Sequence, residues 1–122
     1  MIDKKFVYAV VGASANPEKY GNKVLADLLA GDYKVIPVNP KGGKILGQKV
    51  FPVLSEIFHL PDVVIFVVPP PVAMAVLKEA KDLRIKKFWF QPGSESEEIK
   101  NFCQENKLDA VFDACIMVER KK

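Results

Sequence analysis

The stretch between Phe6 and Ser14 constrains the fold more than any other part of the chain. Residues 6–11 form a short, valine-rich apolar run, which is typical of a strand buried on both faces of a sheet. Gly12 follows directly and permits a sharp turn that a side chain would block. The next amphipathic stretch predicts a helix from about Tyr20, with its N-terminus pointing into this turn. Free N–H groups and the positive end of the helix dipole would then meet at one spot, where a phosphate binds.

Four further apolar stretches predict strands, at 33–39, 63–68, 87–90 and 109–112, with helices between them. This alternation predicts an α/β fold: a Rossmann-like, doubly wound, mainly parallel five-stranded sheet with helices on both faces. The favoured strand order is 3-2-1-4-5 or a close relative. Pro37 has no N–H to donate to a ladder, so the second strand is expected at or near an edge of the sheet.

Local signals mark the ends of the predicted helices. Gly31 ends the first helix, and Pro71 suits the first turn of the second. Ser96 is of the type that caps the N-terminus of a helix and precedes the third.

Length and composition narrow the class of protein. With 122 residues and a net charge of +3, the chain has the size of one domain, and we expect residues 1–122 to form it. The lysines are spread out rather than gathered in a stripe, so no nucleic acid is expected. Cys103 and Cys115 form neither a disulfide framework nor a zinc pattern, and we expect no metal. The chain shows no signal peptide and no apolar run of about 20 residues, so we expect a cytoplasmic protein without a membrane.

Ligands of such sheets bind at the carboxyl ends of the strands, so the segments that follow the strands define the predicted site. Glycine, proline, lysine and small polar residues dominate these segments. Acid–base or metal chemistry would need clustered carboxylates and histidines instead. We therefore expect a binding site without catalytic residues, built from residues 12–14, 39–44, 68–71, 91–94 and 113–115.

The end of the second predicted strand distinguishes between nucleotides. An NAD site needs Gly-x-Gly-x-x-Gly and an acidic residue at this strand end, but no glycine follows Gly12 until Gly21, and Asp32 lies at the wrong end of the strand. The strand ends in Asn39, with Lys41 beyond it. A lysine here attracts phosphate, so the site suits a nucleotide with an extra phosphate, such as a 3′-phosphorylated adenosine or NADP. The alternative is that Lys41 is a solvated loop lysine.

Four motifs follow one another at successive strand ends: residues 10–14 (Val-Val-Gly-Ala-Ser), 38–40 (Val-Asn-Pro), 89–93 (Trp-Phe-Gln-Pro-Gly) and 113–115 (Asp-Ala-Cys). This ordered set resembles the small stand-alone CoA-binding protein family, which is similar to the N-terminal CoA-binding domain of the succinyl-CoA synthetase alpha subunit. The resemblance covers nearly the whole chain and implies a Rossmann-like domain that holds coenzyme A. The synthetase's catalytic phosphohistidine belongs to a second domain, so the resemblance implies no catalysis by this chain.

The resemblance also implies roles for individual residues. Residues 12–14 would approach the diphosphate or the 3′-phosphate ribose, and Lys41 would pair with a phosphate. Residues 68–70 would lie against the adenine or the pantetheine arm, and residues 91–93 would line the far wall. Many family members carry an arginine where this chain has Ala114, so this chain lacks whatever contact that arginine side chain makes. The predicted coenzyme-A-binding residues are Gly12, Ala13, Ser14, Asn39, Pro40, Lys41, Val68, Pro69, Pro70, Gln91, Pro92, Gly93 and Cys115.

Some of these side chains have a second interpretation. Ser14 either binds phosphate or caps its own turn. Cys115 either forms a mixed disulfide with the ligand thiol or is a small buried hydrophobe. Cys103 is expected in the core, and His59 is expected to be structural or exposed rather than catalytic.

The leading hypothesis is non-catalytic, cytoplasmic binding of coenzyme A or an acyl-CoA. The alternatives are an NADP-dependent oxidoreductase, a subunit of an acyl-CoA ligase that acts with partner chains, and a regulatory interaction module. The choice between free CoA and acyl-CoA stays open, as does any protein partner.

Overall fold

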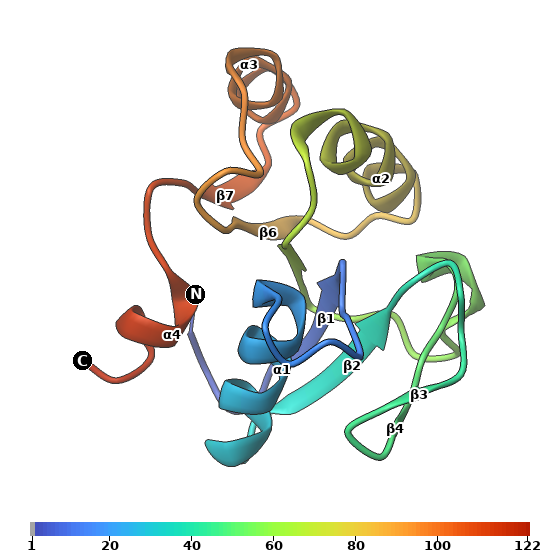
Figure 1. Cartoon of the computed structure of the whole chain (residues 1–122). Helices are drawn as coiled ribbons and strands as arrows, with labels where there is room; N and C mark the ends of the chain where they lie inside the picture. The colour runs from blue at the N-terminus through green and yellow to red at the C-terminus, as the bar shows by residue number, and fades with distance from the viewer. Residues whose placement is uncertain (1) are drawn as a thin grey trace.

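A computed structural model describes residues 2–122, which form a central sheet between two layers of helices (Figure 1). All strands of this sheet run parallel, in the order β2-β1-β5-β6-β7. The predicted fold class, a Rossmann-like parallel five-stranded α/β fold, is confirmed. The strands are β1 (Val7–Val11), β2 (Lys34–Val38), β5 (Val63–Phe66), β6 (Lys87–Phe90) and β7 (Asp109–Val111).

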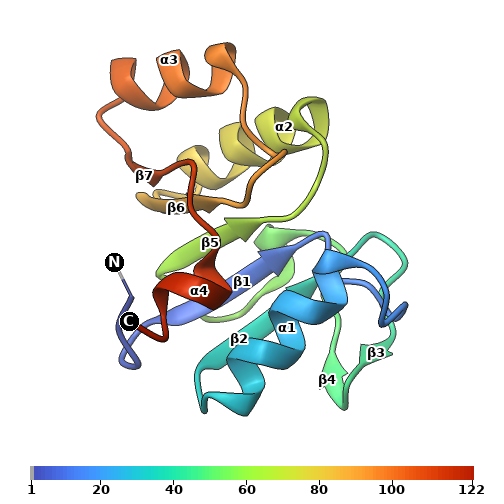
Figure 2. The same cartoon turned by 60° about the vertical axis from the view of Figure 1, so that its left-hand side comes forward.

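Helices cover both faces of the sheet. Figure 2 shows α1 and α4 on one face and α2 and α3 on the other. The first three α-helices lie where the sequence predicts them, and the Ser96 side chain caps α3 by accepting a hydrogen bond from the Ile99 N–H at 3.2 Å. The helix α4 was not predicted, because a single turn has no measurable period. The helices are α1 (Tyr20–Ala30), α2 (Pro70–Asp82), α3 (Glu97–Glu105), α4 (Ile116–Glu119) and a short 3₁₀ helix η1 (Leu54–Glu56).

Alternating side chains of the strands divide the core into two halves. In β1, Ala9 and Val11 pack toward α2 and α3, whereas Tyr8 and Val10 pack toward α1 and α4. All four are buried. Because side chains of a strand alternate between faces, a strand that is apolar throughout must be covered on both sides. The apolar run at the start of the chain is therefore explained by its central place in the sheet.

The observed strand order corrects the predicted order 3-2-1-4-5. The strand β5 lies on the other side of β1 from β2, so Val10 is opposite Pro37 on one side and Ile65 on the other. In the predicted order the second strand would be internal, and Pro37 would interrupt a ladder there. In the observed order β2 is at the edge, as Pro37 predicted.

A small antiparallel hairpin lies beside this edge and was not predicted. It consists of β3 (Lys44–Ile45) and β4 (Gln48–Lys49), and its turn passes through Leu46 and Gly47 at positive φ. The chain then returns along β2: the Phe51 N–H donates to the Pro37 carbonyl, and the Asn39 N–H donates to the Phe51 carbonyl, both at 3.0 Å. Phe51 thereby forms a single parallel bridge to Val38 of β2.

None of the helices between residues 2 and 122 is both long enough and apolar enough to cross a membrane.

Candidate functional site

The turn after β1 and the start of α1 are pressed together at two glycines. Gly12 has φ +98°, and a Cβ there would lie 2.3 Å from the Val67 carbonyl oxygen. A Cβ on Gly21 would lie 1.9 Å from the carbonyl oxygen of Gly12. No side chain fits at either position, so the N-terminus of α1 is held directly on the turn, as the sequence predicted.

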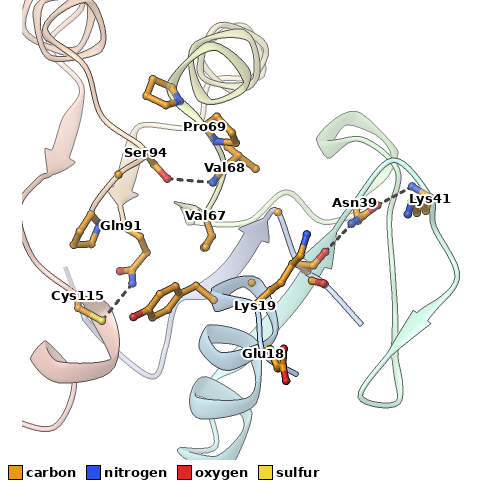
Figure 3. Close-up of a pocket in the computed structure, with 18 residues that line it drawn as sticks. Glu18, Lys19, Asn39, Lys41, Val67, Val68, Pro69, Gln91, Ser94 and Cys115 are labelled. Carbon is orange, nitrogen blue, oxygen red and sulfur yellow. Dashed lines mark hydrogen bonds between the residues drawn. The ribbon is translucent and has the colours of Figure 1, made fainter. Parts of the chain in front are cut away.

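A pocket of about 930 Å³ opens over the carboxyl ends of β1, β2, β5 and β6 (Figure 3). Each residue named above as coenzyme-A-binding lines it except Pro40, which is exposed in the loop after β2. The structure thus brings together five segments that are far apart in the sequence, the last of them at Cys115. The lining also includes residues absent from the predicted coenzyme-A-binding set: Glu18, Lys19, Tyr20, Gly21, Val67 and Ser94, the last of which belongs to the predicted segment 91–94.

Most of these missed residues belong to the start of α1. The turn was predicted to bind phosphate through its backbone, so the side chains next to it were not considered. Tyr20 is the predicted first residue of the helix and Lys19 directly precedes it. This position next to the predicted phosphate-binding turn could have indicated both residues.

Buried polar side chains tie the loops of the pocket to one another. The Asn22 side-chain amide donates to the Ser14 carbonyl at 2.9 Å. The Ser94 hydroxyl accepts from the Val68 N–H at 3.1 Å, and so joins the loop after β6 to the loop after β5. Asn22 and Ser94 are both buried, and a buried polar group without a partner is costly. These polar groups already have partners within the protein, so their contacts fix the shape of the pocket without a ligand.

Asn39 joins the loops after β1 and β2. Its Nδ2 donates to the Ala13 carbonyl at 2.7 Å, and its Oδ1 accepts from the Lys41 N–H at 2.8 Å. The second of these bonds is drawn in Figure 3. Asn39 therefore sets where the backbone of Lys41 stands at the rim of the pocket.

Gln91 links β6 to the start of α4. It is 4% exposed, its Oε1 accepts from the Ile116 N–H at 2.8 Å, and its Nε2 donates to the Cys115 Sγ at 3.3 Å. Next to it, Trp89 Nε1 donates to the Ala114 carbonyl at 3.0 Å. The segment that carries Cys115 is thus held by a side chain of β6, Trp89, and by Gln91 directly after it.

The two cysteines differ in environment. Cys115 is partly exposed and lines the pocket. Cys103 is 3% exposed, and burial raises the pKa of its thiol to about 11. The prediction that Cys103 belongs to the core is confirmed, and both cysteines are free thiols.

The β1–β2 side of the pocket is polar and carries its cations. Lys19 and Lys41 line it, together with the lone carboxylate of Glu18. The N-cap residue of α1, Lys19, makes no side-chain cap, and the first turn of α1 has no acidic residue, whereas α3 has the Ser96 cap and two acidic residues. No side chain of this first turn therefore offsets the positive end of the α1 dipole.

The Ser14 hydroxyl has a local partner. Its Oγ accepts from the Asn16 N–H at 3.1 Å, so it caps its own turn. Its O–H proton can still be donated, and the side chain lines the pocket.

The β5–β6 side of the pocket is mainly apolar, with Gln91 and Ser94 as its polar side chains. Val67, Val68, Pro69, Pro70 and Pro92 line it, and none of them carries a side-chain hydrogen-bonding group. A ligand that fills the pocket thus meets cations at one end and hydrocarbon at the other.

Among the described residues, no histidine lines the pocket, and Glu18 is the one carboxylate that does. His59 is exposed, stacks edge-on against Phe58 and does not line it. Within the described range 2–122, no group of three histidine, cysteine or acidic side chains is arranged to hold a metal ion.

The chain belongs to the CoA binding domain family, whose pattern it matches over residues 7–121. The resemblance inferred from the strand-end motifs is therefore confirmed, and with it the relationship to the CoA-binding domain of acyl-CoA ligase subunits.

Similar proteins include stand-alone chains and one part of a ligase. A solved structure of a conserved hypothetical protein from Pyrococcus furiosus superimposes with a TM-score of 0.89 at 49% identity, covering 93% of this chain and 97% of that one. The uncharacterized protein YneT of Bacillus subtilis (strain 168) is 31% identical over 110 residues, covering 90% of this chain and 82% of YneT. The acetate–CoA ligase (ADP-forming) I subunit alpha of Pyrococcus furiosus is 37% identical over 84 residues. That match covers 64% of this chain but only 18% of the ligase subunit.

Proposed function

We propose that this chain binds coenzyme A, or an acyl-CoA, in the pocket over the carboxyl ends of its strands and performs no chemistry on it. The observation that carries the proposal is the composition of the pocket wall. The wall combines an uncapped helix N-terminus and Lys41 on one side with an apolar surface on the other. Coenzyme A has the matching parts, with phosphates at one end and a largely uncharged pantetheine arm at the other.

Phosphates would bind on the β1–β2 side. The turn at residues 12–14 and the first N–H groups of α1 suit the diphosphate. Lys41 would pair with a phosphate through a charge-assisted hydrogen bond, and Asn39 holds the backbone that carries it. Val68 and Pro69 would pack against the uncharged parts of the ligand.

The absence of catalysis is part of the proposal. Among the residues that line the pocket there is one carboxylate, Glu18, and no histidine. General acid–base catalysis uses a positioned titratable group of this kind, and Glu18 is exposed at the rim. We also propose a cytoplasmic location, where Cys115 would remain a thiol.

A second candidate function rests on the ligase relative. The matched region is 18% of the acetate–CoA ligase subunit alpha, so this chain could supply the CoA-binding part of an acyl-CoA ligase assembled from separate chains. In that case partner chains would co-purify with it, and acyl-CoA formation would appear only when they are present.

Isothermal titration of the purified protein with CoA, acetyl-CoA, NAD and NADP tests the proposal. We expect binding of the CoA species only, weakened about tenfold in Lys41→Ala, since a charged hydrogen bond is lost. Lys44→Ala is the matched control, because Lys44 lies three residues after Lys41, at the start of β3, but does not line the pocket. Binding of NADP in place of CoA would assign the protein to the oxidoreductase class, and binding of none of them would refute the proposal.

A further inference from the structure

Tyr20 is an aromatic side chain that the proposed phosphate site does not use. It is the first residue of α1, it lines the pocket, and 63% of it is exposed. Phe58 is also a largely exposed aromatic residue, at 90%, but it lies outside the pocket. A large apolar side chain that is left in solvent at the mouth of a pocket gains free energy when a ligand covers it.

The position of Tyr20 is fixed from two directions. The next residue, Gly21, is pressed against the turn so closely that no Cβ fits there, so the first turn of α1 cannot move further in. One turn later, Lys23 places its Nζ 5.3 Å from the centroid of the Tyr20 ring, a distance typical of a cation–π contact. The ring is therefore held at the pocket by its own helix.

An apolar wall lies on the other side of the pocket from Tyr20. The helices α1 and α2 cover opposite faces of the sheet, yet the first residue of each, Tyr20 and Pro70, lines the same pocket. Pro69 and Val68 extend the α2 side of this wall. A ligand segment that runs between the two helix starts would be enclosed by a phenol ring and by proline and valine side chains.

This stretch suits one part of coenzyme A better than the others. Phosphates gain nothing from an apolar enclosure, and their cations are on the β1–β2 side. The helix α4 covers the same face as α1, so Tyr20 shares its face of the sheet with the start of α4. That start carries the Cys115 thiol, which contacts Gln91 directly after β6, whereas Lys41 follows β2 at the edge of the sheet.

We propose that Tyr20 packs on the pantetheine arm of bound coenzyme A and holds it against Pro69 and Pro70. Tyr20 is then a specificity residue: it favours ligands that carry the arm over nucleotides that share only the adenosine and its phosphates. The ring supplies this contact, and the phenol hydroxyl is dispensable. The inference rests on the proposed function, because it requires that coenzyme A enters this pocket.

The test compares two ligands on four proteins. Wild type, Tyr20→Ala, Tyr20→Phe and Phe58→Ala are titrated with CoA and with adenosine 3′,5′-diphosphate, which lacks the arm. We expect Tyr20→Ala to lose about tenfold in CoA affinity, as an aromatic contact residue does, and Tyr20→Phe to stay within about twofold of wild type. Phe58→Ala should match wild type, and the diphosphate should bind all four proteins equally.

Each other outcome has a distinct meaning. Unchanged CoA affinity in Tyr20→Ala would overturn the inference and leave the proposed function intact. An equal loss for CoA and for adenosine 3′,5′-diphosphate would overturn the assignment to the arm. A wild-type protein that binds no CoA would refute the proposed function and the inference with it. Unchanged circular dichroism of Tyr20→Ala would establish that its fold is retained.

Discussion

The side-chain amide of Asn39 donates a 2.7 Å hydrogen bond to the main-chain carbonyl of Ala13, which lies 26 residues earlier in the chain. The bond joins the loop after β1 to the loop after the edge strand β2. Since Asn39 also accepts from the Lys41 N–H, one side chain sets both the shape of the turn and the place of the lysine.

Replacing Asn39 by Asp should therefore damage stability and binding together. An aspartate oxygen would face the Ala13 carbonyl, so a hydrogen bond becomes a repulsion. We expect the free energy of unfolding to fall by about 1–3 kcal/mol, measured by urea denaturation, and CoA affinity to fall in the same variant. Asn39→Ala loses the bond without adding the repulsion and should be milder. If Asn39→Asp is as stable as wild type, the bond does not order the loops.

Gly21→Ala should destabilise the protein, although alanine favours helices. Its Cβ would meet backbone, the Gly12 carbonyl oxygen at 1.9 Å. We expect a loss of about 2 kcal/mol or more, where propensity alone predicts a gain of about 1 kcal/mol. Thermal unfolding of Gly21→Ala beside wild type decides the matter, and a stabilised Gly21→Ala would show that α1 can move off the turn.

Lys19→Ser should raise stability while lowering affinity for the ligand. A serine at this position would cap α1, which has no side-chain cap, and a cap contributes about 1 kcal/mol. The same change removes a cation from the pocket and places a hydroxyl where the ligand would meet the helix N–H groups. Ser96→Ala is the opposite case, since it removes the α3 cap outside the pocket. It should cost about 1 kcal/mol and leave CoA affinity alone. Paired denaturation and titration curves test both, and a Lys19→Ser protein that binds CoA as tightly as wild type would contradict the role of this helix end.

Acid should weaken the attachment of the C-terminal segment. The Arg120 Nε donates to the Asp27 Oδ2 at 2.6 Å, and this bond holds the pKa of Asp27 below its ordinary value of 3.8. A lowered pKa means that the charged form is favoured by folding, so this contribution to stability is present above pH 3.8 and is lost as the pH falls through the lowered pKa. Asp27→Asn should reduce Tm at neutral pH by a few degrees and flatten its decline in acid.

The control for the ion pair of Arg120 and Asp27 is an exposed ion pair. Asp109 lies 3.8 Å from Lys87 and is well exposed, so Asp109→Asn should change Tm little at any pH. Melting curves between about pH 2 and pH 7 give the comparison. An Asp27→Asn protein whose acid transition matches wild type would show that the Arg120 contact does not stabilise the fold.

The sequence was sufficient for local elements and insufficient for their arrangement. Each long strand was readable because it is apolar on both faces, and Ser96 marked the start of α3 through its own chemistry. Strand order depends on which side of β1 the third strand packs, and no local pattern encodes that. Pro37 nevertheless argued for an edge position, which the order 3-2-1-4-5 does not allow. Two-residue strands such as β3 and β4 have no periodicity to detect.

The segments that line the pocket after the strands could be predicted from the sequence, whereas the lining side chains of α1 could not. Topology alone brings the carboxyl ends of parallel strands to one edge, so the residues at 12–14, 68–70 and 91–93 were found. The lining contributed by Lys19 and Tyr20 depends on how α1 sits on the turn, which is a matter of packing at Gly21. Pro40 shows the reverse case: it stands between Asn39 and Lys41 in the sequence, but it lies outside the lining.

The segment that consists of the β3–β4 hairpin and Phe51 affects the tendency of the protein to aggregate at high concentration. An open edge strand offers free N–H and C=O groups to strands of other molecules and promotes aggregation. Here Pro37 removes one donor from β2, and Phe51 occupies the carbonyl of Pro37 and the N–H of Asn39. Intermolecular sheet growth is therefore hindered at the carboxyl end of β2, next to the pocket.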